Sequence, residues 1–136
     1  MTGKEESMRR YRVNMGQYDI GRWEFQAVEA LARRYNSNKC RAAVLSQSSA
    51  PEQQRTRRAM EWEVRITDQA LRDTSGGGWE RALRSACCDG WRYEDIDPAL
   101  MPTANRNAFF EARREFYWRL WTIRQEAIGR MIGGGI

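Results

Sequence analysis

The sequence contains no histidine, and only three cysteines and three prolines occur among its 136 residues. Without histidine, neither a Ser-His-Asp triad nor a Cys-His pair can form, and the commonest metal ligand is missing. The cysteines, Cys40, Cys87 and Cys88, are odd in number and two are adjacent, which excludes a disulfide framework and a zinc site of CxxC spacing. We therefore expect a reduced, intracellular protein that is not an enzyme and has no cofactor, metal or small-molecule substrate.

Long apolar runs are also missing. No run approaches the length that spans a membrane, and the opening residues, MTGKEESMRRYR, lack the apolar core of a signal peptide. These absences predict a cytoplasmic protein without a membrane partner.

Lysine is scarce although the chain is basic. The 23 basic residues exceed the 18 acidic residues by a formal charge of +5, and only Lys4 and Lys39 are lysines. Arginine suits bidentate contacts to phosphate and guanine, but a GC-rich coding sequence explains the same bias equally well. The charge permits an anionic partner and does not require one.

Aromatic residues are abundant, with six Trp, five Tyr and four Phe, and 41% of the chain is apolar. This composition favours one folded domain with a modest core. We expect a flexible basic arm over residues 1–18, a single helical domain over residues 19–131, and a disordered tail over residues 132–136.

Two long helices are predicted in the first half of this domain. Residues 19–35 form an apolar stripe at helical spacing, and Asn36–Asn38 supply stop signals before a short helical piece at 40–45. Ser49 is a candidate cap for a helix over 51–73, with Pro51 in its first turn. The two stripes consist of Ile20, Trp23, Ala27, Val28, Leu31 and Tyr35, and of Met60, Val64, Thr67 and Leu71, widened by Trp62, Ile66 and Ala70. Residues 19–73 would form a scaffold or dimerisation half.

The second half begins after a glycine-rich joint, TSGGG, at residues 74–78. A short helix is expected at 79–89 with Gly90 as its terminating residue, followed by a turn of helix within YEDID at 93–97. A long terminal helix runs from near Thr103 to about Met131. Its apolar residues recur at intervals of three and four: Phe109, Ala112, Phe116, Leu120, Ile123 and Ala127. The predicted fold is all-α: two long helices followed by a helix-turn-helix-like group and a long terminal helix.

The order of elements in residues 79–131 is that of a helix-turn-helix, in which the start of the last helix enters the major groove. The candidate DNA-contacting residues are then Thr103, Asn105, Arg106 and Asn107, with Arg113 and Arg114 further along the helix. The connector at 90–102 is longer than the usual turn, so the motif requires residues 93–97 to act as the bracing helix. An ordinary amphipathic helix with polar capping residues is the alternative.

The segments YEDID and MPTANRNAFFEARREFYWRL resemble the C-terminal part of prophage-encoded transcription regulators of the RinA and ArpU type. The resemblance covers about a third of the chain, and the matching positions are Thr103, Asn105, Phe109, Arg113, Arg114, Phe116 and Tyr117. It implies a sigma-factor-like helix-turn-helix, binding to double-stranded DNA near a promoter and contact with RNA polymerase in the bacterial host cell. Residues 19–73, as a scaffold or dimerisation half, leave a homodimer open.

A different function class stays open. A small helical protein rich in Trp and Arg can dock on a host protein and inhibit or redirect it, because these residues dominate binding hot spots. Trp118 and Trp121 are interface anchors if they are exposed and core residues if they are buried. The carboxylates of Glu94, Asp95 and Asp97 could in principle hold a cation, although a solvated acidic turn explains them better.

Overall fold

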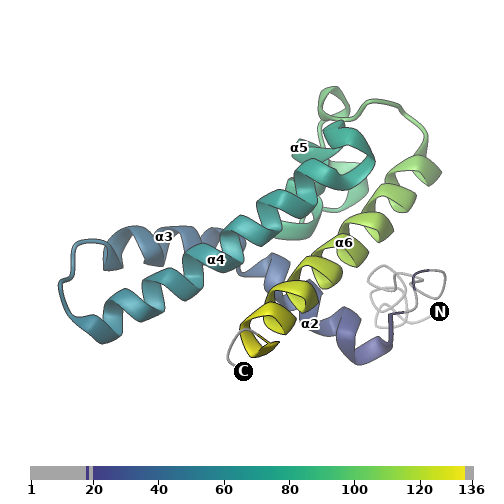
Figure 1. Ribbon diagram of the computed structural model, residues 1–136. Helices are drawn as coiled ribbons and strands as arrows, with labels where there is room; N and C mark the ends of the chain where they lie inside the picture. Colours follow the sequence, from purple (N-terminus) through teal and green to yellow (C-terminus); the bar gives the residue numbers. More distant parts are fainter. Residues whose placement is uncertain (1–17, 19, 134–136) are drawn as a thin grey trace, which may run out of the picture.

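Tyr18 and residues 20–133 are described in the computed structural model of the chain (Figure 1). Every regular element in this part is helical and no strand occurs in it, so the predicted all-α class is confirmed. Over the same residues, no helix combines the length and the apolar character needed to cross a bilayer. Apart from Tyr18, the predicted basic arm lies outside the described residues, as do residues 134–136.

The first helices are α2 (Arg22–Arg33) and α3 (Tyr35–Leu45), and they meet at Arg34 with almost no interruption. The predicted stop at Asn36–Asn38 is therefore wrong. Polar side chains of this segment find partners on distant elements: Asn36 donates to Asp89, and the Tyr35 hydroxyl donates to Asp68 at 2.7 Å. These tertiary contacts outweigh the weak helix propensity of the segment.

The burial of α2 also differs from the prediction. Val28, Leu31 and Tyr35 are buried as expected, but Trp23 is 74% exposed and Ala27 is exposed as well. The reason is Phe25, whose ring meets the ring of Tyr117 edge-on at 5.2 Å. Packing Phe25 against the last helix, α6 (Arg106–Gly133), turns Trp23, two residues earlier, towards solvent.

Helix α4 (Pro51–Asp73) has the predicted bounds, and Pro51 occupies its first turn. The predicted cap is wrong, because Ala50 rather than Ser49 precedes the helix and no side chain caps it. The predicted stripe is buried at Met60, Ile66, Thr67, Ala70 and Leu71. Helices α3 and α4 lie side by side as a hairpin, and the end of the hairpin that carries the connecting loop extends away from α6 (Figure 1).

The chain reverses after α4 in the 3-10 turn η2 (Thr74–Gly77). Thr74 is buried and its hydroxyl donates to the Ala70 carbonyl at 2.7 Å. Gly76 and Gly77 have φ angles of 74° and 91°, which glycine adopts without strain. The predicted glycine-rich joint is thus a turn with a defined backbone conformation.

The expected helix at 79–89 consists of α5 (Glu80–Leu83) and a π-helical turn, η3 (Arg84–Cys88). Gly90 follows two residues after this turn and has a φ of 81°. The connector contains only two 3-10 turns, η4 (Tyr93–Asp95) and η5 (Pro98–Leu100). The segment that was expected to brace the last helix is therefore a single turn, held by the buried side chain of Ile96.

The last helix, α6 (Arg106–Gly133), starts three residues later than predicted. It packs along α4 and across α2, so the core lies where these three helices meet (Figure 1). Its predicted core positions Phe109, Ala112, Phe116 and Leu120 are all buried, while Ile123 is partly buried. The aromatic flank of α6 therefore fastens it to the rest of the molecule, and its polar start extends beyond the core.

Candidate functional site

The turn that precedes α6 and the first two residues of the helix are exposed, at every residue from Thr103 to Asn107. The Thr103 hydroxyl accepts a hydrogen bond from the backbone N–H of Asn105 at 3.2 Å, which shapes the entry into the helix. The Tyr93 hydroxyl donates to the Ala104 carbonyl at 3.3 Å and ties this turn to η4. Four of the six predicted site residues are thus gathered on one exposed tip: Thr103, Asn105, Arg106 and Asn107.

Asn105 caps the N-terminus of α6 with its side chain. Its side-chain oxygen accepts hydrogen bonds from the backbone N–H groups of Asn107, at 2.9 Å, and Ala108, at 3.3 Å. This is the pattern of an N-cap residue, which satisfies donors that the first turn of a helix leaves unpaired. Only the amide nitrogen of Asn105 is left for an outside partner, so a bidentate contact to adenine would compete with the cap.

Arg106 is held in a defined position although its side chain is 59% exposed. Its guanidinium lies 5.2 Å from the ring centres of both Tyr93 and Phe110 and forms a 3.2 Å ion pair with Glu94. The pKa of the Glu94 carboxyl is lowered, first by a hydrogen bond that it accepts from its own backbone N–H and then by the charge of Arg106. Contacts with two rings orient the planar guanidinium in advance of any binding event.

Arg113 and Arg114 do not join the tip. Both are half-buried, and the Nε atom of each is buried without a hydrogen-bond partner in the described structure. Arg114 pairs with Glu111, and the Arg113 guanidinium lies 4.7 Å from the ring centre of Phe110. The six predicted site residues therefore divide into an exposed tip and a half-buried pair on the flank of α6.

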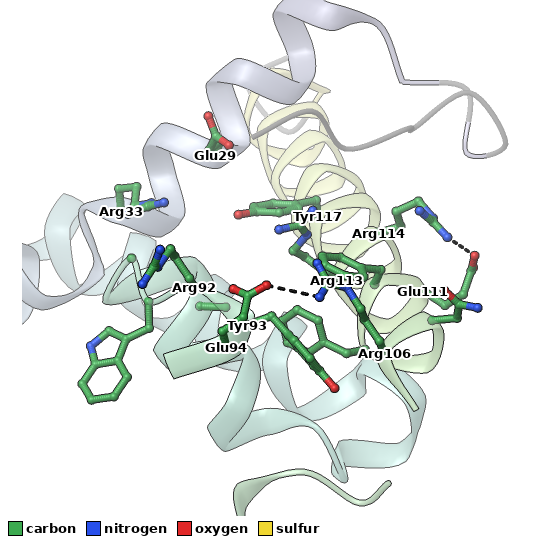
Figure 2. A pocket seen from close by; sticks show the side chains of 16 residues that line it. Glu29, Arg33, Arg92, Tyr93, Glu94, Arg106, Glu111, Arg113, Arg114 and Tyr117 are labelled. Carbon is green, nitrogen blue, oxygen red and sulfur yellow. Dashed lines mark hydrogen bonds and ion pairs between the residues drawn. The ribbon is translucent and has the colours of Figure 1, made fainter. Parts of the chain in front are cut away.

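This pair borders a cavity of about 780 Å³ between α2, residues 90–94 and the first turns of α6 (Figure 2). Arg33 and Arg92 approach the cavity from one side, and Arg113 and Tyr117 approach it from α6 (Figure 2). Five aromatic residues contribute to its wall: Trp91, Tyr93, Phe109, Phe110 and Tyr117. Five arginines line it, namely Arg33, Arg92, Arg106, Arg113 and Arg114.

The cavity also contains acidic groups, at Glu29, Glu94 and Glu111. Burial raises the pKa of the Glu29 carboxyl, while the charges of Arg33 and Arg113 oppose the increase. Beside it, burial raises the pKa of the Tyr117 hydroxyl, which is hydrogen-bonded to the Cys87 thiol. The five arginines outnumber the three glutamates, so the lining keeps a formal excess of two positive charges.

The acidic residues of YEDID have separate partners. Glu94 pairs with Arg106, the Asp95 carboxylate pairs with Arg92 at 2.9 Å, and Asp97 accepts a hydrogen bond from the backbone N–H of Ala99 at 2.9 Å. No group of three Cys, Asp or Glu side chains with a metal-binding arrangement is found in Tyr18 and residues 20–133. These carboxylates fix the connector and orient its arginines.

Trp118 and Trp121 are half-buried and pack against the core. The Tyr18 ring stacks on Trp118 with 5.6 Å between ring centres, and Arg119 lies over the same indole. The most exposed tryptophans are instead Trp23 and Trp91, which are 74% and 53% exposed. Trp118 and Trp121 therefore belong largely to the core packing of α6.

Comparisons with protein-family models, curated proteins and solved structures found no match to this chain. The candidate site consequently rests on its own geometry. Sequence reasoning identified the tip but missed the cavity. Glu29 and Arg33 are four residues apart on α2, a spacing that indicates a shared helix face, but no sequence signal places that face opposite Arg113.

Proposed function

We propose that this chain is a sequence-specific regulator that binds double-stranded DNA with the exposed start of α6. The observation that carries the proposal is the contrast along this helix. Residues 103–107 are all exposed, whereas Phe109, Ala112 and Phe116 behind them are buried. A reading helix requires this arrangement, because its first turn must enter the groove while its remainder stays fixed to the protein.

Each residue of the tip has a distinct role in the proposal. Arg106 presents an oriented guanidinium suited to the O6 and N7 acceptors of guanine, and Asn107 presents an amide suited to adenine. Asn105 caps the helix and offers one hydrogen-bond donor to the DNA, while Thr103 contacts the DNA backbone or a base edge. Arg92, whose side chain is 56% exposed, is suited to a phosphate, and Arg114 reaches one after release from Glu111.

The resemblance to RinA- and ArpU-type regulators supports the same assignment and adds RNA polymerase as a candidate partner. In this proposal the α3–α4 hairpin belongs to the scaffold half, and pairing of two chains through that half would place two tips on one operator. The packing of Trp118 and Trp121 against the core favours DNA binding over docking on a host protein through these two anchors.

The test begins with selection of bound duplexes from a random library, followed by fluorescence anisotropy of the selected duplex over a series of salt concentrations. We expect affinity to fall steeply with salt, because each phosphate contact releases counterions. Arg106→Ala and Asn107→Ala should each weaken specific binding roughly tenfold or more, since a bidentate base contact contributes about 1–3 kcal/mol. Arg58→Ala, at an exposed position near the distal end of the hairpin, is the matched control.

Asn105 needs its own variants because alanine would remove the cap. Asn105→Asp keeps an oxygen at the capping position and places a negative charge on the tip, so it should fold normally and lose DNA affinity. Asn105→Ser keeps the cap without that charge. The proposal is rejected if no duplex is enriched, or if Arg106→Ala and Asn107→Ala bind the selected duplex as tightly as the wild type does.

A further inference from the structure

We propose that the cavity between α2, residues 90–94 and α6 is a binding site for a free nucleoside phosphate. The inference goes beyond the proposed DNA contact, because its ligand is a small molecule that enters a concave site. It depends on the charge, the volume and the aromatic lining of that cavity, and it would stand if the exposed tip bound no duplex.

The charge of the lining favours an anion. Five arginines and three glutamates line the cavity. Arg106 and Arg114 have carboxylate partners there, Glu94 and Glu111. Arg113 forms no ion pair among the described residues; its guanidinium lies over the Phe110 ring, and its charge acts on the Glu29 carboxyl. Arg113 lines the cavity, and a phosphate oxygen is a strong hydrogen-bond acceptor for a guanidinium group.

Arg33 complements Arg113 across the cavity. It ends α2, and its guanidinium lies next to Gly90. Both arginines line the cavity, and the charge of each acts on the half-buried Glu29 carboxyl. Two guanidinium groups that line one cavity can share the oxygens of a phosphate or diphosphate.

The size and walls of the cavity favour more than an inorganic anion. A volume of about 780 Å³ lies within the range of roughly 300–1,000 Å³ that cavities for organic ligands occupy. Tyr93, Phe110 and Tyr117 supply aromatic surface next to the arginines, and Trp91 is exposed at the edge. A nucleoside phosphate combines an anionic group with a planar ring system, and aromatic side chains bind such ring systems by stacking.

The test is isothermal titration calorimetry of the full chain, without DNA, with ADP, GDP, CDP and UDP as separate probes. Adenosine and inorganic pyrophosphate serve as probes for each half of the ligand. We expect at least one nucleoside diphosphate to bind, and to bind roughly tenfold or more tightly than pyrophosphate or adenosine, because only the diphosphate engages both the arginines and the aromatic wall.

Arg113→Gln and Arg33→Gln should each weaken that binding roughly tenfold or more. Arg33 is exposed on the last turn of α2, so its replacement keeps the test valid if the Arg113 variant does not fold. Arg58→Gln, outside the cavity, should change the affinity by no more than about twofold. The inference is overturned if none of the four diphosphates binds, if pyrophosphate binds as tightly as the best diphosphate, or if a folded Arg33→Gln protein binds like the wild type.

The outcome is independent of the DNA experiment. A chain that binds a diphosphate but selects no duplex keeps the cavity site and loses the proposed reading tip. A chain that selects a duplex but binds no diphosphate keeps the tip and loses the cavity site.

Discussion

The carboxylate of Glu115 on α6 accepts two hydrogen bonds from Ser75, forty residues earlier in the chain: one from its backbone N–H at 3.0 Å and one from its hydroxyl at 2.8 Å. Ser75 lies in the turn after α4 and has a φ angle of 48°. The same carboxylate accepts a bond from Arg119 at 2.6 Å. One side chain therefore stabilises the chain reversal and fixes it to the middle of α6.

Glu115→Gln should destabilise the protein by about 1–3 kcal/mol at neutral pH, since hydrogen bonds to a charged group are lost. Burial raises the pKa of the Glu115 carboxyl, but the bonds from Arg119 and Ser75 outweigh it and lower this pKa below the ordinary value of 4.5. A lowered folded-state pKa contributes stability above pH 4.5 that is lost as the pH falls through the folded-state value.

Urea denaturation of wild type and Glu115→Gln at about pH 7 and about pH 3.5 measures this difference. The gap in unfolding free energy between the two proteins should shrink at the lower pH. Glu126→Gln, at an exposed position of the same helix, should change stability by no more than about 0.5 kcal/mol. A gap that stays constant between the two pH values would contradict the assigned role of the carboxylate.

Asn105→Ala should cost about 1 kcal/mol of stability, because two backbone N–H groups in the first turn of α6 lose their acceptor. Asn105→Asp should retain the stability, since aspartate caps helices equally well and its charge complements the helix dipole. Chemical denaturation of the two variants and of Asn107→Ala gives the comparison. Equal stability of Asn105→Ala and wild type would mean that the cap is dispensable.

Phe116→Ala should destabilise the protein by about 3–5 kcal/mol, which is a large share of a typical total of about 5–15 kcal/mol. The Phe116 side chain is fully buried at the centre of the core. Trp23→Ala is an informative partner: a larger side chain is removed, but from a position that is 74% exposed, so we expect a change of about 0.5 kcal/mol or less. A similar melting temperature for both variants would refute the burial pattern.

The three cysteines should differ in reactivity towards a thiol reagent. Cys40 is exposed, whereas Cys87 and Cys88 are buried. Burial raises the pKa of the Cys87 thiol to about 11 and also raises the pKa of the Cys88 thiol, so little reactive thiolate forms at neutral pH. Mass spectrometry after a short alkylation should find one modified site in the native protein and three in urea. Rapid modification of Cys87 in the native state would contradict this structure.

Periodicity predicted the core face of α6, although Phe110, Trp118 and Trp121 place further apolar surface on other sides of this helix. The spacing of Phe109, Ala112, Phe116 and Leu120 identified the core side of α6, and every one of these side chains is buried. It failed on α2, where Trp23 and Phe25 are both apolar and only the contact with Tyr117 decides which one is buried. It also failed at Asn36–Asn38, where partners such as Asp89 and Glu63 come from distant segments of the chain.

The candidate site, like the fold, was predictable from the sequence only in part. The exposed tip was predictable because Thr103, Asn105 and Asn107 are local signals for the start of a helix. The cavity was not, because Arg33, Arg92 and Arg113 belong to three segments that only the tertiary fold brings together. The capping role of Asn105 could not be predicted either, because its cap hydrogen bonds depend on a helix that begins at Arg106 rather than near Thr103.

Arg106 and Asn107 belong to the first turn of α6, and both also form part of the cavity wall. Replacing either residue therefore changes the exposed tip and the cavity wall together. If evolution replaces one of them to change what the tip binds, a second replacement is needed to restore the cavity wall. We expect chains descended from the same ancestor to vary in a correlated way at Arg106 or Asn107 and at the opposite positions Arg33 and Arg92.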